Sequence, residues 1–112
     1  MKLFFALLML VGGMRAEDKI LRVSEVDLRN AATYKVEPEY PAVARQLRVT
    51  GGVELEVVVD PAGAVDKVRV VSGNTLLVGS SMQAIKRWKF KPFEAEGQTV
   101  RAIGPVKFSF QI

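Results

Sequence analysis

Apolar and polar residues alternate most regularly in the middle of the chain, and this alternation predicts a β-hairpin. Residues 53–59 carry valine or leucine at every second position, with Glu54 and Glu56 between them, which is typical of a strand with one buried face. The segment Asp60-Pro61-Ala62-Gly63 has the residue types of a tight turn, because proline presets φ and glycine accepts the left-handed conformation. Residues 64–71 are expected to return as the second strand.

A second alternating segment lies at the end of the chain and predicts a terminal strand. Its apolar positions are Val106, Phe108, Phe110 and Ile112, and its polar positions are Lys107, Ser109 and Gln111. Such a strand packs on one face and is exposed to water on the other. If it lies at the edge of a sheet, its unpaired backbone groups can accept a strand from a partner.

Two other segments have helical character. Pro41 favours the start of a helix over residues 42–48, and Gly51-Gly52 ends it. A second helix is expected over residues 76–89, because helical spacing continues until Pro92 prevents it. The inward-facing positions of this second helix are Leu77, Ser81, Ile85 and Trp88.

These segments follow one another in the order helix, strand, strand, helix, strand. The fold class is therefore expected to be α+β, with a small three-stranded antiparallel sheet and two helices on one face. Residues 93–104 are expected to form a loop that leads to the last strand. Residues 17–36 show neither a clean strand period nor a clean helix period, so we expect an arm with room for one short strand.

The N-terminal residues have the pattern of an export signal. Residues 3–14 form an uncharged apolar run, which is shorter than the about 20 residues that cross a bilayer as a helix. We expect a signal peptide over residues 1–16, an arm over residues 17–33 and one domain over residues 34–112, located in the periplasm. Two alternatives remain open: an uncleaved segment that associates with the membrane, and a buried N-terminal helix.

Charge and composition exclude several classes of function. Lys2 and Arg15 are two of the 16 basic residues, so the chain without residues 1–16 keeps 14 basic residues against 12 acidic ones. A nearly neutral chain is not suited to polyanions, so no nucleic-acid partner is expected. The chain also has no cysteine and no histidine, which removes the thiol nucleophile, the usual general base and the soft metal ligands.

The remaining candidates for chemistry are two carboxylate pairs and three serines, namely Glu37 with Glu39, Glu54 with Glu56, and Ser72, Ser80 and Ser81. The carboxylate pairs lack a third ligand nearby, so they are expected to be solvated rather than to hold a cation. The serines lack a histidine that could activate them. We therefore expect no catalytic residue, no cofactor and no metal site.

Several blocks of unusual composition occur in a fixed order along the chain. They are Pro38-Glu39-Tyr40-Pro41-Ala42-Val43-Ala44-Arg45, Gly51-Gly52-Val53, Val59-Asp60-Pro61-Ala62-Gly63-Ala64-Val65, Val70-Val71-Ser72-Gly73 and Ala84-Ile85-Lys86-Arg87-Trp88-Lys89-Phe90-Lys91-Pro92. Together they resemble the C-terminal domain of TonB and TonB-like proteins, over roughly residues 34–112.

The resemblance implies a function in protein binding. In that family, an extended N-terminal segment of an outer-membrane transporter adds as a strand beside the last strand of the domain. Carried over to this sequence, the partner-binding positions are Val106, Lys107, Phe108, Ser109 and Phe110. The resemblance implies an exported, non-enzymatic domain that binds a partner by strand addition in energy-dependent transport.

The chain also departs from the family pattern. Val78, Ser80 and Ser81 stand where the family often has an acidic residue and two alanines, which predicts a late or frayed helix start rather than a different fold. The apolar run and the arm are too short to act as the family's membrane helix and long linker, so contact with a proton-driven motor is not expected of this chain. The alternative is a free-standing structural or self-associating module that dimerises through the same edge.

Overall fold

The computed structural model describes residues 19–112, so the signal peptide expected at residues 1–16 lies outside the described residues. The helices and strands are, in chain order, β1 (Ile20–Arg22), α2 (Glu25–Ala31), β2 (Ala32–Tyr34), α3 (Ala42–Gln46), β3 (Gly51–Val59), β4 (Val65–Ser72), α4 (Thr75–Lys86), β5 (Lys89–Phe90), β6 (Phe93–Ala95) and β7 (Gln98–Phe110). None of the described helices is both long and apolar enough to cross a membrane.

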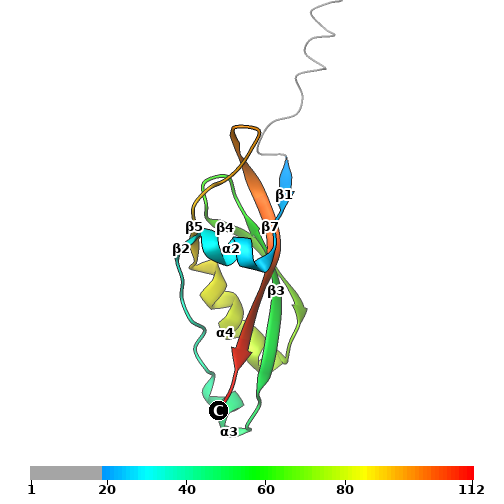
Figure 1. Ribbon diagram of the computed structural model, residues 1–112. Coiled ribbons are helices and arrows are strands. Elements are labelled where there is room, and N and C mark those ends of the chain that lie inside the picture. Colours follow the sequence, from blue (N-terminus) through cyan, green and yellow to red (C-terminus); the bar gives the residue numbers. More distant parts are fainter. Residues whose placement is uncertain (1–18) are drawn as a thin grey trace, which may run out of the picture.

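The main sheet brings together strands from both ends of the described chain (Figure 1). Its path is β1-β7-β3-β4, and β6 pairs with the first part of β7. β7 runs antiparallel to β3 and β6 but parallel to β1. β2 and β5 form a separate two-stranded sheet. β7 thus has a strand on both sides over part of its length.

The hairpin of β3 and β4 confirms the turn expected from the sequence. The Asp60 side-chain Oδ1 accepts hydrogen bonds from the backbone N–H groups of Ala62 at 2.9 Å and Ala64 at 3.0 Å. Gly63 has φ of +94°, and a Cβ at this position would lie 2.0 Å from the carbonyl oxygen of Phe90. Glycine is therefore required here both by its backbone conformation and by the space available.

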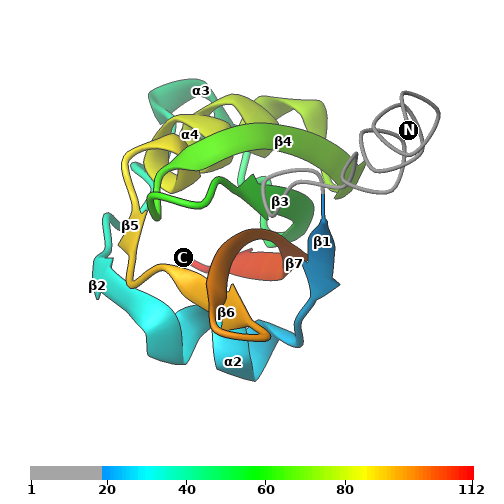
Figure 2. The same ribbon diagram turned by 90° about the horizontal axis from the view of Figure 1, so that it is seen from above.

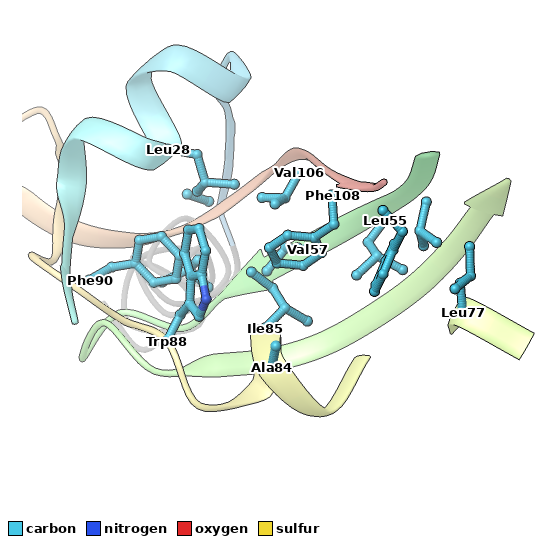
Figure 3. Packing of buried hydrophobic residues seen from close by; sticks show 14 of the residues in the cluster. Leu28, Leu55, Val57, Leu77, Ala84, Ile85, Trp88, Phe90, Val106 and Phe108 are labelled. Carbon is cyan, nitrogen blue, oxygen red and sulfur yellow. The ribbon is translucent and has the colours of Figure 1, made fainter. Parts of the chain in front are cut away.

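α2 and α4 pack against different strands of the main sheet and share one hydrophobic core. Figure 2 shows α4 beside β4 and β3, whereas α2 lies next to β7. Figure 3 shows Leu28 of α2 pointing into the same cluster as Ile85 and Trp88. The residues expected on the inward side of the second helix, Leu77, Ser81, Ile85 and Trp88, are all fully buried. The buried Ser81 hydroxyl is satisfied, because it donates a hydrogen bond to the Leu77 carbonyl at 2.9 Å.

The α+β class is confirmed, but the expected three-stranded sheet was too small. Residues 93–104, expected as a loop, form β6 and the first half of β7. Gly104 and Pro105 are residue types that are uncommon inside strands, yet both lie inside β7. In this part of β7 the odd-numbered residues direct their main-chain groups away from β3. Pro105 is therefore tolerated, because its missing N–H removes no hydrogen bond between β7 and β3.

The expected arm at residues 17–33 also contains more structure than predicted. The arm was expected to have room for one short strand, and β1 is such a strand; α2, which carries the fully buried Leu28, was not expected. The two other helices end earlier than expected, at Gln46 and Lys86. The expected late start of the second helix did not occur, because Asn74 caps it and the helix begins at Thr75.

Candidate partner-binding edge of β7

One edge of β7 is fully paired within the domain. β3 pairs with it antiparallel from Gly51 opposite Phe110 to Val59 opposite Ala102. We call this the inner edge and the opposite side of the same strand the outer edge. The inner edge cannot accept another strand, so any strand addition to β7 takes place at the outer edge.

The first part of the outer edge is covered by β1. Ile20, Leu21 and Arg22 pair in parallel with residues 101–103 of β7. The N–H of Val23 continues this pairing and donates a hydrogen bond to the Ile103 carbonyl at 2.9 Å. The outer edge is therefore able to hold an extended segment that runs parallel to β7.

The next outward-facing residue with an N–H group is Lys107, and α2 covers it with side chains. The Glu25 Oε2 accepts hydrogen bonds from the Lys107 N–H and from Arg29 Nε, both at 2.9 Å. Arg29 also donates from Nη2 to the Lys107 carbonyl. Both main-chain groups of Lys107 are thus satisfied by one ion pair of α2.

Two aromatic rings hold the Arg29 guanidinium in place. It lies 5.5 Å from the Trp88 ring centroid and 6.0 Å from that of Phe108. Cation–π contacts of this kind add to the ion pair with Glu25. α2 is therefore fixed against β7 by a charged cluster at the surface and by Leu28 in the core.

Ser109 is the next position whose main chain faces outward. The N–H groups of Val23 and Lys107 show that residues 103 and 107 of β7 present their main chains to the outer edge, and alternation extends this direction to Ser109. The hydrogen bonds of β1 to β7 end at Ile103, and those of α2 end at Lys107. The Ser109 side chain is exposed. Within the described chain, this end of the outer edge is open.

The five partner-binding positions expected from the sequence separate into two groups. Val106, Phe108 and Phe110 are buried in the core, whereas Lys107 and Ser109 are exposed. The side chains of the first group face the core, so they support the strand rather than contact a partner. Only the main chain and the two polar side chains are directed to where a partner could bind.

Sequence reasoning allowed a short strand in the arm but missed α2 and the residues that line the outer edge. Glu25, Arg29 and Val23 lie in the segment that was expected to be an arm. One signal was present: Ser24 precedes Asp27 by three residues, and its Oγ accepts the Asp27 N–H at 3.1 Å. This Ser-x-x-Asp spacing is typical of a helix start.

The open end of β7 is held in position by Tyr40, which contacts Phe110. The rings of Tyr40 and Phe110 meet edge to face with centroids 5.4 Å apart. The Tyr40 hydroxyl donates to the Val49 carbonyl, and the Arg45 guanidinium lies 4.8 Å from the Tyr40 ring centroid. These contacts order the last residues of β7, which a partner strand would need as a template.

Ion pairs cross the exposed face of the sheet. Glu56 accepts a hydrogen bond from Arg69 at 3.0 Å, and this bond holds the pKa of the Glu56 carboxyl below its ordinary value. The Lys107 Nζ lies 4.0 Å from a Glu54 oxygen, and Arg101 pairs with Asp66. Of the two carboxylate pairs considered as cation sites, Glu54 and Glu56 thus face basic side chains of neighbouring strands.

Comparison with known proteins agrees with this architecture. The family described as "Gram-negative bacterial TonB protein C-terminal" matches residues 36–112. Protein TonB of Vibrio cholerae is 33% identical over 90 residues, which cover 77% of this chain and 37% of that protein. Protein TonB of Escherichia coli K12 is 34% identical over 58 residues, which cover 50% of this chain and 24% of that protein.

The fold itself matches a solved domain. The solution NMR structure of the Pseudomonas aeruginosa TonB CTD superposes with a TM-score of 0.62, at 23% identity, over 72% of this chain and 84% of that chain. This likeness supports the fold. The chain spans well under half the length of the two TonB proteins that it resembles. Because the family match extends over more than half of the chain, the protein belongs to the TonB C-terminal domain family.

Proposed function

We propose that this domain binds an extended segment of another envelope protein by strand addition to the outer edge of β7. The observation that carries the proposal is the outward main chain of Ser109, which lies beyond the hydrogen bonds of β1 and α2. An ordered strand with free N–H and C=O groups can pair with an extended chain at little entropic cost to the domain. The partner class is an outer-membrane transporter segment, as the family resemblance implies.

Main-chain pairing supplies affinity in this mode, and side chains supply specificity. The exposed Lys107 and Ser109 are the side chains that would lie next to the added strand, while Val106, Phe108 and Phe110 hold the template in the core. No catalytic step is part of the proposal. The proposed location is the periplasm, where the domain and a transporter segment would meet, and the proposed role is in transport across the outer membrane.

The test compares two substitutions at Ser109. A proline removes the outward N–H, whereas alanine keeps it, so Ser109→Pro should abolish binding and Ser109→Ala should leave it nearly unchanged. The probe is a synthetic peptide with the extended N-terminal segment of an outer-membrane transporter, here called the transporter peptide, and the readout is calorimetry.

Folding of both variants is checked by near-ultraviolet circular dichroism of Trp88. Equal affinity of the two folded variants would exclude strand addition at this end of β7. Sedimentation of the free chain tests the alternative of self-association. If the chain dimerises and Ser109→Pro dissociates the dimer, the occupant of the edge is a second copy rather than a transporter.

A further inference from the structure

The main sheet has a second open edge, at β4. β4 is the last strand of the path β1-β7-β3-β4 and pairs with β3 on one side. On its other side, the described chain makes only an isolated bridge between Ala64 and Lys89, just before the strand begins. Val70 and Val71 remain 36% and 45% exposed on this strand. A free edge of this kind either accepts an added strand or is protected against one.

The free main-chain groups of β4 belong to Val68 and Val70. Leu55 and Val57 of β3 pair with even-numbered residues of β7, whose main chains face β3, so the main chains of Leu55 and Val57 point to β7. Val70 and Val68 lie opposite these two residues on β4. Their N–H and C=O groups therefore point away from β3, to the open edge.

A groove of about 470 Å³ lies at this edge, between β4 and α4. Val68 borders it together with Met82 and Lys86 of α4, and Lys67 borders it on the exposed face of the sheet. Lys67 and Lys86 are both exposed, and neither has an ion-pair partner in the part of the chain that the structure describes. The groove thus has an unpaired positive charge on each face of the sheet.

The other charged groups of the groove are already paired. Arg69 pairs with Glu56 at 3.0 Å, and Asp66 pairs with Arg101. These two ion pairs leave no carboxylate of the groove to neutralise Lys67 or Lys86. The positive charge at the edge is therefore available to a partner.

A second copy of this chain does not fit the β4 edge. Antiparallel pairing of two β4 strands about a two-fold axis at Val68 places Lys67 of one copy opposite Arg69 of the other, on the same face. An axis at Lys67 or at Arg69 places two lysines or two arginines opposite each other. Like charges directly opposite destabilise a strand pair. The edge is thus protected against its own copy, but not against a strand of opposite charge.

We infer that the β4 edge is a second docking site, and that its occupant is an extended acidic segment of another protein. Neighbouring side chains of an added strand point to opposite faces. Two consecutive acidic residues therefore direct one carboxylate to Lys67 and the other to Lys86, while an apolar neighbour packs on Val68 and Met82. The site is separate from the proposed function, because β3 and β7 lie between β4 and the outer edge of β7.

Two synthetic peptides with blocked ends test the inference on the full chain. The acidic peptide is Thr-Val-Glu-Glu-Val-Thr, and the neutral peptide has glutamine in place of both glutamates. NMR of the isotope-labelled chain follows binding and amide exchange. The acidic peptide should slow exchange at Val68 and Val70 and leave Ser109 unchanged. At low salt, the neutral peptide should bind about fivefold more weakly. Equal affinity of the two peptides, or slowed exchange only at other strands, would overturn the inference.

Two double variants with the same net charge locate the attraction. Lys67→Gln with Lys86→Gln removes the two lysines of the groove. Lys35→Gln with Lys91→Gln removes two exposed lysines that directly follow β2 and β5 of the separate sheet. The first pair should abolish the preference for the acidic peptide, and the second should keep it. Loss of the preference in both would mean that net charge attracts the peptide, and would overturn the site.

A pair of variants at Val70 tests main-chain pairing. Val70→Pro removes an outward N–H, whereas Val70→Ala keeps it. The acidic peptide should bind Val70→Ala at least about tenfold more tightly than Val70→Pro, with the fold of each checked by the near-ultraviolet signal of Trp88. Equal affinity of the two folded variants would overturn strand addition. If Val70→Pro does not fold, exchange at Val68 and Val70 in the unaltered chain decides.

The inference and the proposed function fail separately. Val70→Pro should bind the transporter peptide as the unaltered chain does, and Ser109→Pro should keep its affinity for the acidic peptide. Sedimentation tests the excluded occupant. If the free chain dimerises with slowed exchange at Val68, the edge belongs to a second copy and the inference is overturned.

Discussion

The two edges of β7 are built in different ways. The inner edge pairs with one continuous strand, β3, from Ala102 to Phe110. The outer edge is assembled from separate pieces: the short strand β1, the side chains of Glu25 and Arg29, and the open main chain at Ser109. Continuous pairing over a buried face stabilises the fold, whereas a composite edge can lose one piece and keep the rest. The inner edge thus stabilises the fold, and the outer edge is the one at which another strand can bind.

A substitution in the core that packs against β7 should have the largest effect on stability. Trp88 is fully buried, packs edge to face on Phe108 with centroids 5.9 Å apart, and donates from Nε1 to the Val36 carbonyl at 2.9 Å. Trp88→Ala should lower the free energy of unfolding by about 3–5 kcal/mol. Urea denaturation followed by far-ultraviolet circular dichroism measures it.

Lys86→Ala is the matched control, because Lys86 is exposed at the end of α4, two residues before Trp88. Its cost should stay below about 0.5 kcal/mol. Similar costs for Trp88→Ala and Lys86→Ala would show that the core under β7 does not carry the stability assigned to it.

The turn that aligns β3 with β4 should give the next largest effect. Gly63→Val introduces a β-branched residue at φ of +94° and a clash with the Phe90 carbonyl, so it should cost about 2–4 kcal/mol. Gly97 also has positive φ, but nothing lies within 4 Å of a Cβ there. Gly97→Val separates backbone strain from the clash, and thermal denaturation of both variants should rank Gly63→Val as clearly the more destabilised.

A methyl group under the outer edge should have a smaller and more local effect. Gly104→Ala places a Cβ against Val23 and should cost about 1–2 kcal/mol, with faster amide exchange confined to residues 20–23. Gly79 lies in α4 with open space around a Cβ, so Gly79→Ala should instead stabilise the chain by up to about 1 kcal/mol. Uniformly faster exchange in Gly104→Ala would mean that β1 is an integral part of the core.

Local patterns allowed much of the fold to be predicted. The β3–β4 hairpin follows from alternation and from a turn whose residues interact within the turn itself, at Asp60 and Gly63. The buried stripe of α4 follows from helical spacing. Both depend on neighbours in sequence, which is the information that a single sequence contains.

The parallel pairing of β1 with β7 could not be predicted in this way. Ile20 pairs with Arg101, a residue near the other end of the chain, and three residues are too few to show a strand period. The same limit applies to the candidate site. Alternation identified Lys107 and Ser109 as residues with exposed side chains. It did not predict that Glu25 and Arg29 form hydrogen bonds with the main chain of Lys107.

Amide hydrogen exchange measured by NMR tests the difference between the two edges most directly. In the free chain, the inward N–H groups of Phe108 and Phe110 should exchange slowly and that of Ser109 quickly. Saturation with the transporter peptide should slow exchange at Ser109 and leave Phe108 unchanged. Exchange that stays fast at Ser109 with the peptide bound, or that slows only along β4, would contradict the assignment of partner binding to the outer edge of β7.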